Sequence, residues 1–348
     1  MAGDDGRKKT RRRKNRKQSK AHGGPSKESL IERHFEYDSK AKDAAKKRFE
    51  KTPLPIGIPE DFGTPGHFSF NWENKPVTLE TETILASKVV RRGEFGWLPD
   101  KRVDEIGKMV DDLDMTLDQA LSLRSAMLQQ KTVYSHGQLQ ARGKALHRLY
   151  REGVNVIDLS KKFDFPPMNV FRVILKEMGW SKSRIKETLR SPSKFKQRER
   201  EEFEAAEAAD RVSNVDQSET HVRADIFEEI LADWFEDQGV NVRRQGEMVK
   251  EQMQDHGRPV NTPDLLFLDH VEINGEPVAW IDAKHFYGAD VNFQRKKIVK
   301  QAGRYVDTWG QGALVFRHGF CENVHIPGTI LLDCGPLNLE ELNQVTEA

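Results

Sequence analysis

Residues 264–284 read DLLFLDHVEINGEPVAWIDAK, with an apolar run on each side of Asn274-Gly275. Asparagine and glycine both tolerate the positive φ that a tight turn requires, so this stretch predicts a β-hairpin. Asp264 opens the first predicted strand, while Asp282 and Lys284 close the second and lie on one side of its pleat. Charged groups that end an apolar strand are costly to bury unless they bind something. The hairpin therefore indicates a functional site.

The register of the hairpin decides whether the two acids meet. A two-residue turn at Asn274-Gly275 pairs Phe267 with Asp282 and leaves Asp264 on the other side of the sheet. A β-bulge, a three-residue loop, or a position for Asp264 just before the strand would restore convergence. We expect one of these, and the sequence does not say which.

The chemistry that suits such a group is metal-assisted cleavage of a phosphodiester. Carboxylates are hard oxygen ligands of the kind that Mg²⁺ and Mn²⁺ take. Lys284 is placed to orient or deprotonate an attacking water, or to stabilise charge on the phosphate. The alternative is an exposed hairpin end that carries an ordinary salt bridge.

A family resemblance rests on these residues. Thr262-Pro263-Asp264, followed by Asp282-Ala283-Lys284, resembles the signature of the PD-(D/E)XK nuclease superfamily. More narrowly, the Thr-Pro-Asp motif together with Trp280-Ile281, Trp309-Gly310 and Gly319-Phe320 resembles the codanin-interacting nuclease family, also called the TPD-motif family. That family is related to archaeal Holliday-junction resolvases. The resemblance covers roughly residues 145–340. It implies a restriction-endonuclease-like α/β fold, an activity on DNA that extends to branched DNA, a codanin-like partner and a homodimer.

The superfamily places a further acid on a helix before the hairpin. Residues 224–238 predict that helix, because their apolar residues recur at helical spacing and Gly239 is a typical C-terminal stop. The spacing in related resolvases points to Glu228 as this acid, with Glu229 as the alternative. A solvated helix face is the other interpretation of this pair. The resemblance thus implies a metal set of Asp264, Asp282 and Glu228.

A helix from Gln294 to Trp309 is predicted to follow the hairpin. It carries a basic stripe that suits a phosphate backbone, formed by Lys297, Lys300 and Arg304. Gln301 and Tyr305 resemble the motif after the catalytic lysine in RecB-type members, which makes Gln301 a candidate site residue; Tyr305 is equally suited to the core. Residues 313–316 and 329–332 predict two more buried strands, giving the order α-β-β-α-β.

Residues 145–189 predict a separate helical unit. Three short helices with a tight turn at Pro166-Pro167 before the last resemble a helix-turn-helix domain. Asn169, Arg172 and Lys176 are expected to face outward on the third helix, where they would meet phosphates or base edges. The alternative is a small helical scaffold that binds no nucleic acid.

Charge is distributed unevenly along the 348 residues, although the formal net charge is only +1. Ten of the fourteen residues from Arg7 to Lys20 are Lys or Arg, so the remainder is acidic overall. Such a block predicts disorder and indicates a nuclear-localisation signal or nucleic-acid arm. No apolar run approaches the roughly eighteen residues that span a bilayer, and two cysteines are too few for a structural zinc site by themselves. We therefore expect a nuclear protein with no membrane segment, and the cytoplasm is the second expected location.

The expected organisation is an α/β PD-(D/E)XK domain at the C-terminus, preceded by a mostly α-helical, helix-turn-helix-like half. The predicted divisions are a basic tail (1–27), a helical and loop region of unknown role (28–135), the helix-turn-helix-like domain (136–195), an acidic helix and linker (196–220), the nuclease domain (221–340) and a short tail (341–348). The leading hypothesis is a Mg²⁺- or Mn²⁺-dependent nuclease. The rivals are a catalytically silent nucleic-acid-binding adaptor that docks a codanin-like protein, and a helix-turn-helix regulator.

Overall fold

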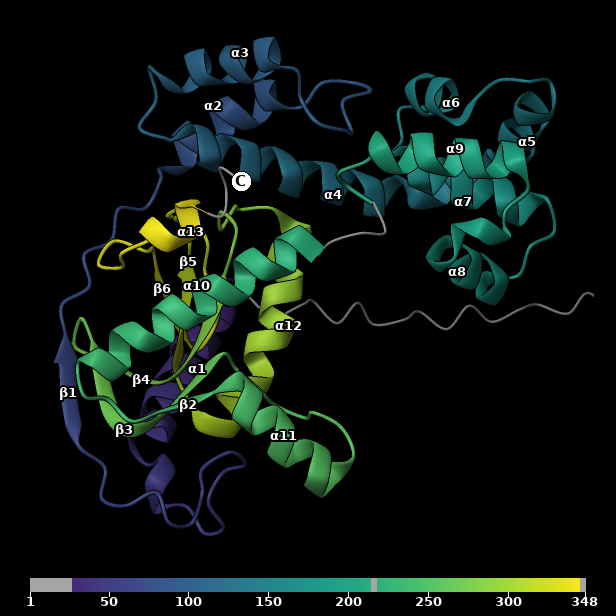
Figure 1. Ribbon diagram of the computed structural model, residues 1–348. Coiled ribbons are helices and arrows are strands. Elements are labelled where there is room, and N and C mark those ends of the chain that lie inside the picture. Colours follow the sequence, from purple (N-terminus) through teal and green to yellow (C-terminus); the bar gives the residue numbers. More distant parts are fainter. Residues whose placement is uncertain (1–26, 214–217, 345–348) are drawn as a thin grey trace, which may run out of the picture.

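A computed structural model describes residues 27–213 and 218–344, and the basic block at Arg7–Lys20 lies outside them. The described chain forms an α/β core and a helical body joined by one long helix, α4 (Leu117–Ala141) (Figure 1). No helix in these described segments has the length and apolar content needed to cross a membrane.

The core is built on a mixed sheet of six strands. Its order is β1-β3-β4-β5-β6, and β2 also pairs with β3. The β3–β4 and β2–β3 pairs are antiparallel, and the other pairs are parallel. The strands are β1 (His67–Phe70), β2 (Val242–Arg244), β3 (Leu265–Ile273), β4 (Glu276–Lys284), β5 (Gly312–Phe316) and β6 (Thr329–Leu332).

Helices cover both faces of this sheet. On one face α10 (Ser218–Asp237) and α13 (Glu340–Gln344) pack through a cluster that includes Phe227, Phe235 and Phe267. On the other face α12 (Asn292–Trp309) and α1 (Lys27–Lys46) pack around Trp280 and Trp309. The predicted helix-strand-strand-helix-strand order is therefore present, in a mixed α/β layer arrangement.

Residues 28–135, for which the sequence predicts no role, are part of this core. They supply β1 at the sheet edge, the short 3₁₀ helix η1 (Arg48–Glu50), α2 (Leu79–Val89) and α3 (Asp100–Val110). Leu85, Ile106 and Leu123 are buried in the same cluster as Trp280. The segment is thus continuous in packing with the C-terminal half, although more than a hundred residues separate them in sequence.

The helical body has a core of its own, from Leu139 to Ala206. Asp164 ends α6 in the left-handed conformation (φ 54°), and Pro167 begins α7, as the predicted turn requires. The acidic helix that the sequence predicts before the linker is α9, which buries Phe203 and Ala206 against this body. The helices of the helical body are α5 (Gly143–Arg151), α6 (Val156–Phe163), α7 (Pro167–Glu177), α8 (Lys182–Arg190), the 3₁₀ helix η2 (Pro192–Lys194) and α9 (Gln197–Ala208).

A β-bulge sets the register of the hairpin. Near the turn, where Asn274 and Gly275 have positive φ, Ile273 pairs with Glu276; beyond the bulge, Leu265 pairs with Ile281. The shift falls between Leu266 and Val271, which are separated by four residues where β4 has one. A shift by an odd number of residues moves the side chains of a strand from one face of the sheet to the other. The bulge therefore brings Asp264 to the face that carries Asp282, whereas a two-residue turn without a bulge would leave it on the opposite face.

Candidate active site

The centre of the site is an ion pair at the end of β4. The ammonium of Lys284 binds Oδ2 of Asp282 directly. Both side chains are buried, with 2% of Asp282 and 8% of Lys284 exposed. They point to the same side of the strand because they are two residues apart.

Asp264 reaches this pair from the start of the neighbouring strand. Its Oδ2 accepts a hydrogen bond from the backbone N–H of Ala283, 2.6 Å away, which lies between Asp282 and Lys284. Its Oδ1 accepts from Nε2 of Gln245 at 2.9 Å. Asp264 lies just before β3, and the shifted register continues toward Asp282. The bulge and the position before the strand, two of the alternatives left open by the sequence, occur together.

The bulge itself is anchored by a buried arginine. Arg48 from η1 donates to the carbonyls of Ala45 (2.6 Å), Phe267 (3.4 Å) and Asp269. The carboxylate of Asp269 accepts from the N–H groups of Gly66 and Asn241, each at 2.7 Å. The helix η1 and the residues just before β1 and β2 thus fix the shape of β3, and this shape brings Asp264 to the site.

Glu228 on α10 faces the same group of charges, and Glu229 does not. Burial, then the charges of Asp225 and Asp282, raise the pKa of Glu228 to about 7. Glu229 is exposed and pairs with Arg244 instead. Of the two acids that the sequence left open, only Glu228 interacts electrostatically with Asp264, Asp282 and Lys284.

Gln301 on α12 connects the ion pair to the rest of the pocket. Its Oε1 accepts from Lys284 Nζ at 3.3 Å, and its Nε2 donates to Asp282 Oδ1 at 3.3 Å. The hydroxyl of Tyr305 lies 3.4 Å from Nε2 and donates to the carbonyl of Thr262 at 3.2 Å. Tyr305 is thus both a core residue and a support for the loop that carries Asp264.

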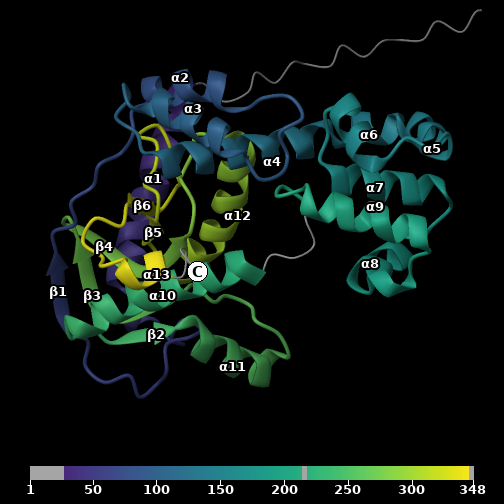
Figure 2. The same ribbon diagram turned by 45° about the horizontal axis from the view of Figure 1, so that its top comes forward.

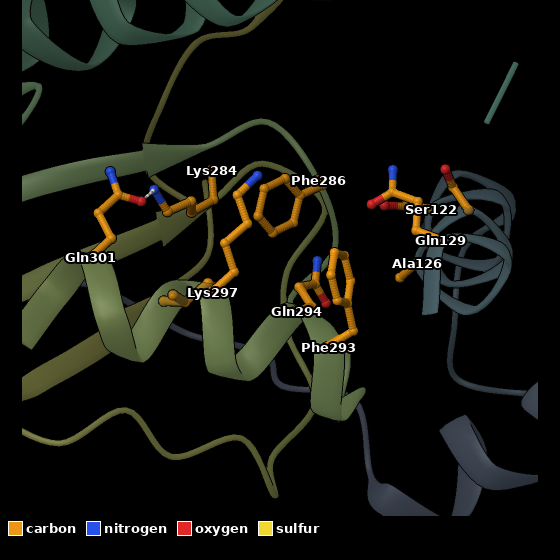
Figure 3. Close-up of a pocket in the computed structure, with 11 residues that line it drawn as sticks. Ser122, Ala126, Gln129, Lys284, Phe286, Phe293, Gln294, Lys297 and Gln301 are labelled. Carbon is orange, nitrogen blue, oxygen red and sulfur yellow. Dashed lines mark hydrogen bonds between the residues drawn. The ribbon is translucent and has the colours of Figure 1, made fainter. Parts of the chain in front are cut away.

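The basic stripe of α12 runs beside these residues. Lys297, Lys300 and Arg304 are all exposed, and Lys297 lines the same pocket as Lys284 and Gln301 (Figure 3). The pocket has a volume of about 150 Å³. Across it lie Ser122, Ala126 and Gln129 from α4.

Sequence reasoning missed Gln245 and the residues of α4. Gln245 begins α11 (Gln245–His256), and its backbone N–H also donates to the Asp264 carbonyl at 2.9 Å. A polar residue next to a short strand carries no signal of this contact in one sequence. For residues 28–135 the sequence predicts a helical and loop region, but it does not show which helix face would meet the site.

The carboxylate oxygens of the site are of the donor type that a divalent cation takes. Burial and the nearby charges of Asp282 and Glu228 raise the pKa of Asp264 well above its usual range. Three carboxyl groups thus face one ammonium, a buried imbalance that a hard cation would offset. In this arrangement, no group of three or more His, Cys, Asp or Glu side chains within residues 27–213 and 218–344 is close enough to hold a metal. The Lys284 ammonium contacts Asp282 directly, so this ion pair would rearrange on binding.

The helical body places its three candidate nucleic-acid contacts, Asn169, Arg172 and Lys176, differently. Arg172 is partly buried and donates to the carbonyl of Ser213 at 3.1 Å; burial lowers its pKa. Asn169 donates to the Ser213 hydroxyl at 2.7 Å. Lys176 is exposed and donates to Gln140 Oε1 at 2.7 Å. Neither Arg172 nor Lys176 lies at the acid site, because both are on α7.

Fold and site together define a mixed α/β protein with a buried, lysine-paired carboxylate site and a helical appendage. Residues 195–334 match the profile of a family described as a protein of unknown function with the TPD sequence motif. The TPD-motif part of the resemblance is thus confirmed for this region, which runs from the residues preceding α9 to just beyond β6.

An uncharacterized protein of Acanthamoeba polyphaga mimivirus is 30% identical to this chain over 115 residues. The aligned region is 32% of this chain and 40% of the viral protein, so the chain spans less than half the length of that relative. No solved structure matches the chain.

Proposed function

We propose that this chain is a metal-dependent endonuclease of the PD-(D/E)XK type, related to Holliday-junction resolvases, that hydrolyses phosphodiester bonds of DNA, including branched DNA. The observation that supports this proposal is the meeting of Asp264, Asp282, Lys284 and Gln301 in one group of polar contacts, of which Lys284 and Gln301 line the pocket. These residues come from three separate segments of the chain. An ordinary surface salt bridge joins two side chains, whereas this group is assembled from three segments and depends on the β-bulge.

Asp264 and Asp282, with help from Glu228, would hold Mg²⁺ or Mn²⁺. A bound ion would make a water more acidic and screen the charge that develops on the phosphate. Lys284 carries a positive charge at the pocket, where it can orient the attacking water or stabilise the phosphate oxygens. Gln301 fixes the position of Lys284, and Lys297 with Lys300 and Arg304 would attract the phosphate backbone.

The test is a cleavage assay with labelled branched, duplex and single-stranded DNA in Mg²⁺, Mn²⁺ or EDTA. Cleavage should need the metal. Asp282→Ala should abolish cleavage and keep DNA binding. Glu228→Gln should impair cleavage, whereas Glu229→Gln, one position along the same helix, is the matched control and should not. Cleavage that survives Asp282→Ala would show that the reacting group lies elsewhere.

A second candidate is a catalytically silent adaptor that binds nucleic acid and docks a codanin-like protein. One observation favours it: Asp282 is already paired by Lys284 and Gln301 through protein contacts alone. The same assay separates the two functions. DNA binding without cleavage under every metal, together with capture of the partner by wild type and Asp282→Ala alike, would favour the adaptor.

Nuclear location and a homodimer are further parts of the proposal. The basic block Arg7–Lys20 would direct nuclear entry, which a fluorescent fusion with and without this block would test. The related resolvases suggest the dimer, and the mass of the purified full-length chain in solution would establish or refute it.

A further inference from the structure

The helical body contains a basic groove between α4, α7 and α8. Its volume is about 770 Å³. None of the lining residues that the structure describes carries a carboxylate, and five are cationic: Arg172, Lys176, Lys182, Lys186 and Arg190. Lys182, Lys186 and Arg190 on α8 are exposed. A concave surface with one sign of charge concentrates a ligand of the opposite sign.

The usual approach of a helix-turn-helix domain does not account for this groove. Such domains read base edges with the N-terminal residues of the second helix. Here residues 210–213 lie over that end of α7, since Ser213 binds both Asn169 and Arg172 and the buried Asp210 accepts from Met168 N at 2.9 Å. The accessible cations are further along α7 and on α8.

One face of α4 connects this groove to the pocket lined by Lys284, Lys297 and Gln301, which we call the catalytic pocket. Ser122, Gln129 and His136 are successive heptad positions, so they differ by only about 20° per step around the helix. Ser122 and Gln129 line the catalytic pocket, while His136 and Gln140 line the basic groove. Gln129 and Gln140 are separated by about 16 Å along the axis. In both views α12 and α8 lie on the same side of α4 (Figures 1 and 2).

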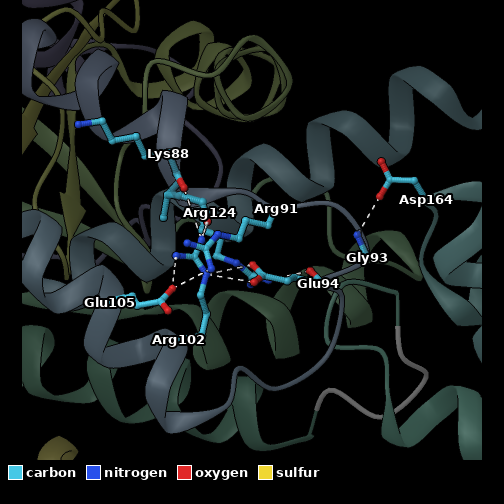
Figure 4. Close-up of polar contacts among 9 residues, drawn as sticks. Lys88, Arg91, Gly93, Glu94, Arg102, Glu105, Arg124 and Asp164 are labelled. Carbon is cyan, nitrogen blue, oxygen red and sulfur yellow. Dashed lines mark hydrogen bonds and ion pairs between the residues drawn. The ribbon is translucent and has the colours of Figure 1, made fainter.

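Polar contacts fix α4 relative to its surroundings. Arg124 on α4 donates to the carbonyl of Glu94 at 2.6 Å, and the Glu94 carboxylate pairs with the buried Arg102 at 3.0 Å (Figure 4). Nearer the groove, Asp164 accepts from Lys131 Nζ (2.6 Å) and Gly93 N (3.0 Å). The spacing between pocket and groove is therefore held by the core and the helical body together.

We propose that this face of α4 is a track along which a nucleic-acid strand runs from the basic groove to the catalytic pocket. The inference rests on the proposed nuclease function and adds a second attachment point to it. The strand's phosphates would bind the cations of α8 and α7 at one end and Lys297 at the other. Between them, this face of α4 carries the polar side chains of Gln129 and His136 and the exposed Val133. At about 3.4 Å per stacked nucleotide, the 16 Å step corresponds to about five nucleotides.

Crosslinking tests the path directly. Val133 is 48% exposed and lies between Gln129 and His136 on this face. A photo-crosslinking benzoylphenylalanine at Val133, in full-length protein that also carries Asp282→Ala, should crosslink single-stranded or branched DNA. The same group at Gln138, which is exposed on the opposite side of α4, is the matched control and should not. Equal crosslinking at both positions, or none at Val133 while DNA is bound, would overturn the track.

Charge reversal tests the groove. Wild type should bind a strand that is long enough to reach the groove more tightly than a short strand that fills only the pocket. A triple variant should lose this gain in affinity: Lys182→Glu, Lys186→Glu and Arg190→Glu combined. The dependence of log affinity on log salt should weaken by about 2, since each lost contact with a single strand contributes about 0.7. The matched control reverses three exposed lysines on α2 and α3, Lys88, Lys101 and Lys108. Equal losses in both variants would mean non-specific attraction and overturn the groove.

These outcomes are distinct from failure of the nuclease proposal. Crosslinking at Val133 without cleavage by wild type would retain the track and reject the enzyme. Cleavage by wild type without crosslinking would do the reverse. If an acidic polypeptide competes for the groove while nucleic acid does not bind it, the groove serves a protein partner and the proposal is wrong.

Discussion

The α/β core and the helical body carry their charges in opposite ways. In the core, Asp264, Asp282 and Lys284 are buried, and the pKa of Asp264 is raised by desolvation and by its neighbours. In the helical body, Lys182 and Lys186 are exposed at the edge of an open groove. A buried charge is costly and sensitive to geometry, whereas an exposed charge costs little and acts mainly through its field. The proposed function uses this difference: it assigns chemistry at one point to the core and attachment along a surface to the helical body.

The largest expected effect comes from removing the buried ammonium. Lys284→Met should lower cleavage by about two to four orders of magnitude, because the cation at the pocket is lost. It should also lower the free energy of unfolding by about 3–5 kcal/mol, since Asp282 remains buried without its charged partner. Cleavage rates and urea unfolding measure the two effects.

A double variant separates them. Asp282→Asn with Lys284→Met removes both charges and should recover most of the stability while cleavage stays lost. Recovery of cleavage in the double variant, or full activity in Lys284→Met alone, would mean that this pair only holds the fold together.

The next effect concerns the device that positions Asp264. Arg48→Met should lower the free energy of unfolding by about 2–4 kcal/mol, because the carbonyls of Ala45, Phe267 and Asp269 lose a buried donor. Cleavage should fall as well, since β3 would no longer be held in its bulged register. Arg91→Met, which removes an arginine paired with Glu105 on the surface, is the control and should cost about 0–1 kcal/mol.

This bulge also shows where sequence reasoning stops. The turn at Asn274-Gly275 and the two strands were predictable because turn chemistry and apolar runs are local. The register was not, because it depends on a donor that lies 219 residues before Phe267 and on Asn241, 28 residues before Asp269. No local pattern encodes the meeting of those groups.

Some residues of the candidate site could likewise be identified from the sequence, whereas others depend on how distant elements pack. Asp264, Asp282 and Lys284 could be singled out from residue type and position at strand ends, and Gln301 and Glu228 from the family resemblance. The roles of Gln245, Ser122 and Gln129 depend on how α11 and α4 pack against the sheet. Residues 28–135 had no recognisable motif, yet they provide Arg48 and most of α4, because packing partners need only be apolar and in the right place.

A smaller effect is expected in the pH dependence of stability. Glu228 has a pKa of about 7 in the fold against an ordinary value of 4.5, so the folded chain holds the proton more tightly than the unfolded chain. The folded state then binds more protons between these values, and stability should fall as pH rises from about 4.5 to about 7. The pKa of Asp264 is also raised in the fold, so its ionisation lowers stability as the pH rises in the same way. Urea unfolding across this range should show a shallower decline for Glu228→Gln than for the wild type.

The smallest expected effect lies where the two regions meet. Lys131 on α4 and Asp164 at the end of α6 form a partly exposed ion pair of 2.6 Å, and Asp164 also accepts from Gly93 N. Asp164→Asn keeps a residue that tolerates the left-handed conformation and keeps an oxygen for Gly93, so it removes mainly the charge. A double-mutant cycle with Lys131→Met should give a coupling of about 0.5–1 kcal/mol. Because the pair joins the helical body to α4, the Asp164→Asn variant should lose some crosslinking at Val133 while it cleaves short strands as wild type does. If cleavage and crosslinking fall together, the core and the helical body do not divide chemistry from attachment.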